Sequence, residues 1–262
     1  MIIGIISDIH EDIKRLKEAF IILKKQKCDK IVCLGDFTGY SVPYFGYLDS
    51  RNAHKVINLL KNKCDLIIAG NHDLYSVKKL PKHRAGINYP RNWYSLDYRT
   101  KKRISKNKIH LYDHHHLSAM LTKEDEKFIR KLPEYKVKKY GDLKILFSHY
   151  AYPDLVGTKK YELQTPKDVK KHFAFMEKHG CTLGISGHEH YYGIRVFTKD
   201  RVRRVQFKRS TKLTKNMTWL FGPNVAKSYE ANGVMVLDTD KMEIKAIPLK
   251  SKIHKVPKWK YL

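Results

Sequence analysis

Five polar clusters in the chain each follow a short apolar run and carry side chains that could bind a metal ion. They are Asp8-Ile9-His10, Gly35-Asp36, Gly70-Asn71-His72-Asp73, Ser148-His149 and Gly187-His188-Glu189-His190. Their donors are carboxylate, amide and imidazole groups without a thiolate, a set that suits one or two divalent cations such as Mn²⁺, Fe²⁺ or Zn²⁺. The candidate ligands are Asp8, His10, Asp36, Asn71, His149, His188 and His190.

Seven ligands are enough for two metal ions if one carboxylate binds both. Each ion needs about four protein ligands, and we expect Asp36 to be the shared one. Two aspartates against two dications leave the site positively charged, which favours an anionic phosphate. Two ions about 3.5–4 Å apart can hold both an activated water and the phosphoryl oxygens during in-line attack. The predicted chemistry is hydrolysis of a phosphate ester by a metal-bridging hydroxide.

The apolar runs before the first three clusters are typical of strands in a parallel sheet. Residues 1–7, 31–34 and 66–69 form these runs, and apolar residues recur at helical spacing over 13–23 and 53–60. This β-α-β-α-β order predicts parallel strands joined by right-handed crossovers. Because the carboxyl ends of such strands meet at one edge of the sheet, we expect the candidate ligands to converge there.

The rest of the chain is predicted to hold fewer regular elements until its β-rich last third. Between the third and fourth clusters, a helix is expected only over Thr122–Leu132, where Thr122 and Asp125 resemble a capping box and Pro133 ends the run. Further expected elements are a strand at 143–147, a helix at 167–179, a strand at 182–186, and hairpins at 194–197 with 201–207 and at 233–238 with 242–249. We expect one domain over residues 1–249, with an insertion at about 78–116 and a basic tail at 250–262.

The series DIH, GDFTG, GNHD, SH and GHEH resembles, in this order, the motifs of the calcineurin-like metallophosphoesterase superfamily. The resemblance extends over residues 1–249. It implies an α/β fold of four layers, an αββα sandwich in which two mixed β-sheets are flanked by helices. It also implies hydrolysis of phosphomonoesters or phosphodiesters with two divalent metal ions, Mn²⁺ being our first expectation and Fe or Zn the alternatives.

The resemblance also assigns roles to individual residues. It implies one metal on Asp8, His10, Asp36 and His190, and the other on Asp36, Asn71, His149 and His188. His72 would contact the phosphate or protonate the leaving oxygen, and Asp73 would orient His72. An adjacent carboxylate would also favour the imidazolium form of His72. The alternative is that His72 does not contact the substrate and only supports the residues that bind the metal ions.

The sequence departs from the family pattern at two positions, and the first of them narrows the class of substrate. The second motif continues as GDFTGYS, without the Asp-Arg-Gly of the protein serine/threonine phosphatases, so a protein phosphatase is not expected. Glu189 stands where a small or hydroxyl residue is usual between the two histidines. Glu189 either accepts a hydrogen bond from a residue that binds the metal ions or is a solvated side chain.

The charge of the chain favours an anionic partner. Lys and Arg number 53 against 26 Asp and Glu, a net charge of +27. Residues 78–108 hold eleven Lys and Arg but one acid, Asp97, interleaved with aromatic rings that could stack on bases. The candidate substrate-binding residues there are Arg91, Trp93, Tyr94 and Tyr98; the alternative is a solvated insertion anchored by its aromatics.

Three further features carry weaker expectations. Residues 195–215 hold nine basic residues against Asp200, but strand alternation places the charge on both faces of the predicted hairpin. For the His114–His116 run, an exposed loop is favoured over an accessory metal site. The four cysteines, at positions 28, 33, 64 and 181, show no CxxC pair and are expected to be buried free thiols rather than a disulfide framework or a zinc knuckle.

The sequence thus predicts a cytoplasmic metallophosphoesterase that does not contact a membrane, since it has neither a signal peptide pattern nor a long apolar run. The expected partner is a phosphate ester. A phosphodiester, such as a nucleotide or nucleic acid, is modestly favoured over a small phosphomonoester. A non-catalytic binding scaffold with this fold is the third alternative.

Overall fold

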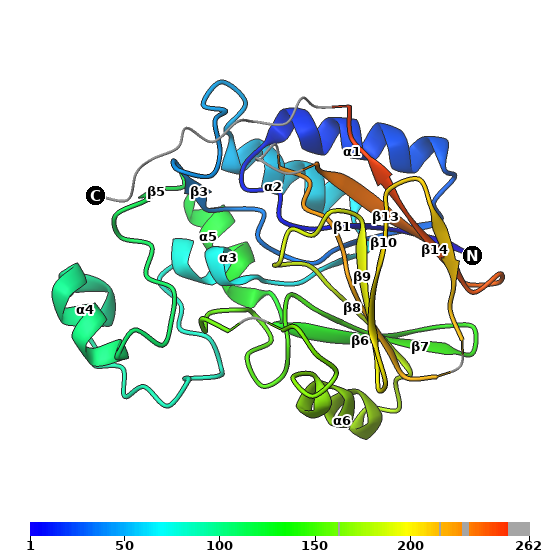
Figure 1. Cartoon of the computed structure of the whole chain (residues 1–262). Coiled ribbons are helices and arrows are strands. Elements are labelled where there is room, and N and C mark those ends of the chain that lie inside the picture. Colours follow the sequence, from blue (N-terminus) through cyan, green and yellow to red (C-terminus); the bar gives the residue numbers. More distant parts are fainter. Residues whose placement is uncertain (162, 215, 227–230, 251–262) are drawn as a thin grey trace.

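Two six-stranded mixed sheets form the centre of the computed structural model, which describes residues 1–161, 163–214, 216–226 and 231–250 (Figure 1). The predicted tail at 250–262 lies outside the described residues except for Lys250. Across the described ranges, no helix has the length and apolar character needed to span a bilayer. The division into one domain over 1–249 stays a prediction.

The first sheet combines strands from both ends of the chain. Its order is β11 (Ser210–Lys212), β14 (Glu243–Pro248), β13 (Gly233–Asp238), β1 (Ile2–Ile6), β2 (Lys30–Cys33) and β4 (Leu66–Ile67). The predicted parallel unit is confirmed, because β1, β2 and β4 run parallel and are joined by α1 (Ile13–Lys25) and α2 (Ala53–Lys63). The side chains of Asp12 and Asn52 cap these two helices by accepting backbone N–H bonds.

The second sheet is built from the middle of the chain. Its order is β10 (Val202–Val205), β9 (Ile194–Thr198), β12 (Thr218–Phe221), β8 (Leu183–Ser186), β7 (Leu143–Ser148) and β6 (Tyr135–Tyr140). Strands β7, β8 and β12 are parallel, and β9 with β10 forms the predicted hairpin. The sequence analysis missed β6 and β12. In β6, lysines interrupt the apolar residues at an edge of the sheet, and β12 has only four residues.

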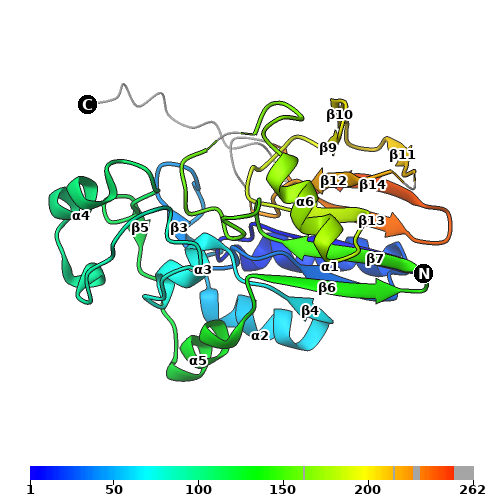
Figure 2. The ribbon, with the colours of Figure 1, turned by 90° about the horizontal axis from the view of Figure 1, so that it is seen from below.

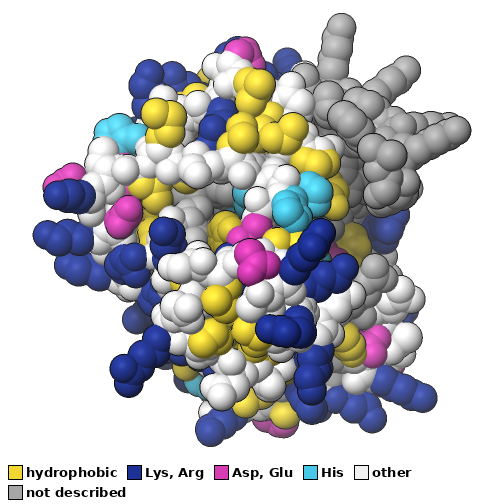
Figure 3. Space-filling model, turned by 90° about the vertical axis from the view of Figure 1, so that its left-hand side faces the viewer, with side chains coloured by type: hydrophobic (Ala, Val, Ile, Leu, Met, Phe, Trp, Pro, Cys, Tyr) yellow, Lys and Arg dark blue, Asp and Glu magenta, His cyan; other side chains and the backbone are white. Residues whose placement is uncertain are grey.

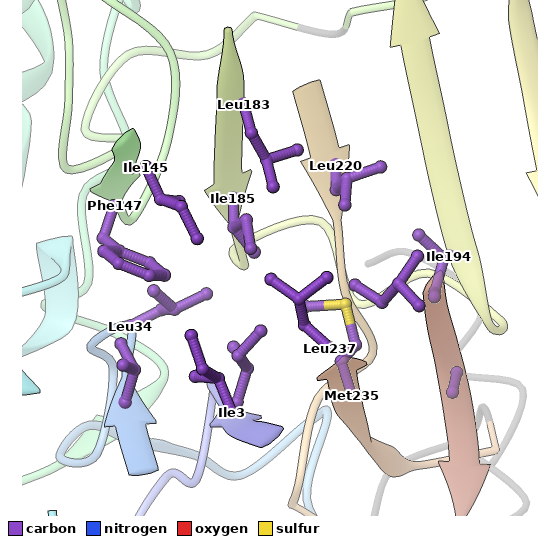
Figure 4. Packing of buried hydrophobic residues seen from close by; sticks show 14 of the residues in the cluster. Ile3, Leu34, Ile145, Phe147, Leu183, Ile185, Ile194, Leu220, Met235 and Leu237 are labelled. Carbon is purple, nitrogen blue, oxygen red and sulfur yellow. The ribbon is translucent and has the colours of Figure 1, made fainter. Parts of the chain in front are cut away.

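Three apolar clusters separate the layers of the fold. The largest lies between the sheets, where Ile3 and Leu34 of the first sheet face Phe147 and Ile185 of the second (Figure 4). Another lies between the first sheet and helices α1 and α2, and a third between the second sheet and α6 (Lys170–Lys178). Helices therefore cover both outer faces (Figure 2), and the predicted four-layer sandwich is confirmed.

The stretch between β4 and β6 departs from the prediction of one helix. Helix α5 (Lys123–Lys131) has the predicted capping box of Thr122 and Asp125. The prediction missed α3 (Asn71–Ser76), the short η1 (Trp93–Ser95) and α4 (Tyr98–Ser105). Helix α4 has eight mostly charged residues, so it shows little apolar periodicity.

The insertion also contributes a short strand to the edge of the site. Strand β5 (His116–Leu117) pairs with β3 (Tyr40–Ser41), and α4 lies apart from both sheets (Figure 1). Ile87, Trp93 and Ile109 form an apolar cluster of the insertion itself. All four cysteines are free, as predicted, but the prediction that all four are buried is wrong: Cys33 and Cys181 are buried, whereas Cys28 and Cys64 are half-buried.

Candidate metal centre

Every predicted metal ligand lies just after the carboxyl end of a strand or at the start of a helix that follows one. Asp8 and His10 follow β1, and Asp36 follows β2. Backbone bonds tie these two loops together, from the N–H of Asp8 to the carbonyl of Gly35 (3.0 Å) and from that of His10 to Asp36 (3.0 Å). The parallel topology thus brings residues distant in sequence to one edge, as expected.

The ligand atoms of six of these residues fall into two groups. Asp8, His10 and His190 form one group, and Asp36, His149 and His188 form the other; within each, the atoms lie within 4.8 Å of one another. In the Asp36 group, His149 Nε2 lies 3.0 Å from Asp36 Oδ2 and 3.3 Å from His188 Nδ1. In the Asp8 group, His190 Nε2 lies 3.3 Å from Asp8 Oδ1 and 3.4 Å from His10 Nε2. The family resemblance divides these six residues in the same way, with Asp36 shared by both metals, and that division stays a prediction.

Backbone carbonyls orient two of the histidines so that lone pairs point into the cluster. Nδ1 of His10 lies 2.8 Å from the carbonyl oxygen of Gly39, and Nδ1 of His149 lies 2.8 Å from that of Leu34. Each Nδ1 therefore donates a proton, and Nε2 of the neutral ring is an acceptor. Acceptors that face one another across a buried space repel, and a cation between them removes the repulsion. The donor set therefore fits metal ions.

The Asn71 side chain extends the same pattern. Its Oδ1 faces only acceptors: the carbonyl oxygen of Val156 at 2.9 Å, Asp36 Oδ2 at 3.1 Å, and the ring nitrogens of His149 and His188 at 3.2 Å each. Its Nδ2 donates to the hydroxyl of Tyr112. Without a cation, the rotated amide satisfies these acceptors through its N–H groups, and its oxygen accepts from the Tyr112 hydroxyl. The oxygen would face the cluster when a cation is bound there. Asn71 then belongs with the Asp36 group, as expected.

The two aspartates are buried and each uses one oxygen on a backbone N–H. Asp8 Oδ2 accepts from His188 (2.9 Å), and Asp36 Oδ1 accepts from His72 (2.9 Å). Asp8 Oδ1 has no hydrogen-bond partner among the described residues. Since a buried carboxylate oxygen without a partner is costly, this oxygen also fits a metal ligand.

Without a cation, the two carboxylates make the His149 ring hold a second proton tightly. Burial alone would lower the pKa of His149, but Asp36 and Asp8 outweigh it and raise that pKa to about 10. Burial would raise the pKa of Asp8, and the neighbouring His190 and His149 hold it low instead. A cation would displace the His149 proton, so metal binding and protonation compete here.

The backbone is strained at most of the candidate ligands. Asp8, His10, Asp36, His188 and His190 all have φ between +44° and +71°, which residues other than glycine seldom adopt. Asp and His are among the residue types that tolerate this region best. Such strain gathers at functional sites, where the surrounding structure must compensate for it. Here it turns each side chain from the strand end toward the common centre.

Glycines before two of the ligands are required by close approach. A Cβ on Gly187 would lie 2.6 Å from Asp8 Oδ2, and a Cβ on Gly70 would lie 2.1 Å from Asp36 Oδ1. The glycines of the GHEH and GNHD motifs thus leave room for the carboxylates. This gives a packing reason for these two motif positions.

The structure does not place Asp73 where the sequence analysis expected it. Its carboxylate accepts the backbone N–H groups of Asp36 (2.7 Å), Phe37 (3.1 Å), Thr38 (2.9 Å) and Gly70 (3.0 Å), and also the Thr38 hydroxyl (2.9 Å). Burial and Asp36 raise the pKa of Asp73 to about 7, against the effect of these donors. Asp73 therefore fixes the loop that carries Asp36, and we find no hydrogen bond from it to the His72 ring.

The predicted imidazolium form of His72 is not favoured either. Burial, with the nearby His116 and His10, lowers the pKa of His72 well below its usual range. The ring lies 3.8 Å (Nε2) from Asp36 Oδ2, and its Nδ1 has no hydrogen-bond partner among the described residues. His72 is therefore a neutral side chain at the edge of the cluster.

A cavity of about 320 Å³ opens over the cluster. Its lining includes His10, Asp36, Asn71, His72, His188, Glu189 and His190, together with residues of the loop at 41–45 and the insertion at 110–116. Figure 3 looks onto the side of the molecule where histidine and acidic side chains gather, with Lys and Arg side chains around them.

Comparison with known proteins decides the family. The sequence pattern described as "Calcineurin-like phosphoesterase" matches residues 1–192. The chain belongs to this family. A metallophosphoesterase from Sphaerobacter thermophilus has a similar structure (TM-score 0.66, 15% identity), with 96% of this chain and 89% of that chain covered. A hypothetical protein from Pyrococcus horikoshii is also similar (TM-score 0.57, 13% identity), with 96% and 88% covered.

Among curated sequences, an uncharacterized protein of Methanocaldococcus jannaschii is 25% identical over 164 residues. The match covers 59% of this chain and 55% of that relative, so it spans little more than half the relative's length. The structural likenesses show that this calcineurin-like phosphoesterase shares its fold with metallophosphoesterases.

The insertion of this calcineurin-like phosphoesterase reaches the site by residues other than the four predicted ones. Arg91, Trp93, Tyr94 and Tyr98 do not line the cavity. Trp93 is only 4% exposed because it packs in the cluster of the insertion, and Arg91 is exposed. These aromatics anchor the insertion, which was the alternative interpretation.

The sequence analysis missed Tyr112 and His116. The His116 ring stacks on that of His72, with centroids 4.6 Å apart and planes 16° apart, and Tyr112 lies 4.6 Å from the same ring. His116 belongs to the run expected to be an exposed loop, and it is half-buried instead. The sequence does show a histidine run close to an aromatic residue. It does not show that this run lies beside the site.

Proposed function

We propose that this protein is a hydrolase that cleaves a phosphodiester with the help of two divalent cations. The observation that carries the proposal is the set of acceptor atoms of His10, His149 and Asn71 that face the two buried aspartates. Family membership supports phosphoester chemistry, and the two groups of ligand atoms support two ions.

The side chains would divide between the ions as the sequence suggested. Asp8, His10, Asp36 and His190 would hold one ion, and Asp36, Asn71, His149 and His188 the other. When bound, the two cations supply Lewis acidity, which activates the attacking water and stabilises charge on the phosphoryl oxygens. Mn²⁺ is our first candidate, with Fe or Zn as alternatives, because the donors are nitrogen and oxygen atoms only.

His72 would act on the leaving group. Its ring lines the cavity, and the stacked ring of His116 fixes its plane. An anionic phosphate nearby favours the charged form of a histidine, so substrate would raise the low pKa of His72 and let it deliver a proton to the leaving oxygen. His72 would take up this proton from solvent when the anionic substrate binds, and the uptake would depend on the charge of the substrate rather than on Asp73.

The lining of the cavity favours a diester over a monoester. Among the described residues that line it, there is no Lys or Arg, and Glu189 is present. A phosphomonoester carries between one and two negative charges at pH 7, whereas a diester carries one. A wall without cationic side chains but with a carboxylate therefore suits the diester. The cytoplasmic location expected from the sequence stays a prediction.

The test compares bis-p-nitrophenyl phosphate with p-nitrophenyl phosphate on the purified protein, with Mn²⁺ and with a chelator. We expect Mn²⁺-dependent release of nitrophenol with a higher kcat/KM for the diester. Asp36→Asn should abolish turnover, and His72→Ala should reduce kcat by about 10²–10⁴-fold. Asp97→Asn, at the exposed cap of α4, is the control. Preference for the monoester would overturn the diester assignment, and turnover unaffected by chelator would overturn the metal assignment.

A further inference from the structure

A second hollow borders the candidate metal centre. It has a volume of about 520 Å³ and is lined by Leu163, Gln164, Glu189, Tyr191, Arg195, Val202, Arg203 and Arg204. Glu189 lines this hollow and also the cavity over the metal centre. The two spaces therefore adjoin at the residue that lies between His188 and His190.

The hairpin of β9 and β10 lies at an edge of the second sheet (Figure 2). Its pairing brings two arginines together. In the antiparallel register, Arg204 is directly opposite Arg195. Directly opposite residues project on the same face of a sheet, and like charges in such a pair repel. The sequence analysis considered only the alternation within one strand, and it missed that the partner strand supplies the second charge of this face.

These arginines lack acidic partners within the described part of the chain. The arginines that form ion pairs there are Arg15 and Arg51. Arg195 and Arg204 share one face of the hairpin, whereas Arg203 lies opposite Val196 on the other face and donates to the Thr211 hydroxyl (2.8 Å). Among the described residues that line the hollow, the guanidinium groups of Arg195 and Arg204 against the carboxylate of Glu189 leave a positive charge.

Arg195 is also held in place before any ligand arrives. Its guanidinium lies 4.8 Å from the centre of the Tyr191 ring and 4.9 Å from that of Phe197. It donates to the Tyr191 hydroxyl and to the carbonyl oxygen of Gln164 (3.2 Å). An arginine fixed on aromatic faces loses little freedom on binding a phosphate, to which its planar fork is well matched.

We propose that this hollow binds a second phosphate group of the substrate, one that is not hydrolysed. The substrate would then be a phosphodiester that carries at least one further phosphate, such as a short single-stranded oligonucleotide. This inference rests on the proposed function, because it places the scissile phosphate at the metal centre. The described residues that line the cavity there include no Lys or Arg, so the arginines beside it would supply charge selectivity.

The test uses two ligands that differ by one phosphate: thymidylyl-thymidine and its 5′-phosphorylated form. Each is measured for hydrolysis with Mn²⁺ and, separately, for binding in the presence of a chelator, by calorimetry. The variant is Arg204→Gln, which changes an exposed side chain, and the control is Arg201→Gln, which lies on the same hairpin but does not line the hollow. Thermal melting establishes that both variants are folded.

We expect the unmodified protein to bind the phosphorylated ligand about tenfold more tightly and to show a correspondingly lower KM for it. Arg204→Gln should remove most of this preference with kcat unchanged, and Arg201→Gln should keep it. A preference that is absent, or that both variants reduce equally, would overturn the inference even if the diester is hydrolysed. Selective binding without any hydrolysis would overturn the proposed function and support the phosphate site.

Discussion

The substitution Asp73→Asn separates the role that the structure gives this residue from the role implied by the family resemblance. Asp73 Oδ2 accepts two N–H groups, and Oδ1 accepts two N–H groups and a hydroxyl. An amide nitrogen in place of either oxygen would face two or three donors. Each buried donor left without an acceptor costs about 1–3 kcal/mol, so we expect a loss of about 4 kcal/mol of unfolding free energy.

A loss of this size is readily measured by thermal melting. For a chain of this length, 1 kcal/mol shifts Tm by about 2–4 °C, so the variant should melt about 8–16 °C lower, measured at pH 8 by circular dichroism. Activity should also fall, because the same bonds fix the backbone of Asp36. Asp97→Asn is the control, since Asn caps a helix as well as Asp. A normal Tm with reduced kcat would show that Asp73 acts on His72 and would refute the structural reasoning.

Two further predictions test other parts of the structure. Tyr112→Phe removes the hydroxyl that bonds to the Asn71 amide, so Mn²⁺ should bind about tenfold more weakly in a calorimetric titration. Tyr98→Phe is the control. Unchanged Mn²⁺ affinity of Tyr112→Phe would show that the hydroxyl does not orient this amide. Burial lowers the pKa of His172 to about 3 in the folded protein, whereas a histidine in the unfolded chain has a pKa of about 6.5. Below about pH 6.5 the unfolded chain therefore binds more protons than the folded one. The unfolding free energy should decrease as the pH is lowered, by up to about 1.4 kcal/mol per pH unit. His172→Gln should flatten this dependence between about pH 6 and pH 4 in urea titrations, and equal slopes in both proteins would contradict it.

Much of the fold follows from local sequence patterns. The runs that became β1 and β2, and the stripes that became α1 and α2, have the periodicity of their elements because each is buried on a defined face. Strand β6 could not be predicted so easily, since Lys136 and Lys139 leave no continuous apolar run in it. Helix α4 begins after the N-cap residue Asp97 and has no apolar stripe that would reveal it in the sequence.

The same limit applies to the site. Asp8 and Asp36 could be placed near each other because they follow β1 and β2, which are parallel neighbours in the first sheet. His149 follows β7 of the second sheet, so it reaches them only because the two sheets pack face to face, which the expectation of a single sheet edge did not include. The contacts of His116 and Tyr112 depend on how a loop folds back over the sheets, which no spacing encodes. The role of Asp73 was misjudged for a similar reason: adjacency in sequence suggested a contact with His72, whereas helix α3 turns its carboxylate toward the loop of Asp36.

The way the insertion is built has a consequence for the evolution of this protein. Ile87, Trp93 and Ile109 pack with one another, whereas the sheets are stabilised by side chains elsewhere. Mutations in residues 110–116 could therefore alter what lies over the candidate site while the two sheets stay intact. On the proposed function, changes at a few of these loop positions would be enough to change which substrates the cavity admits.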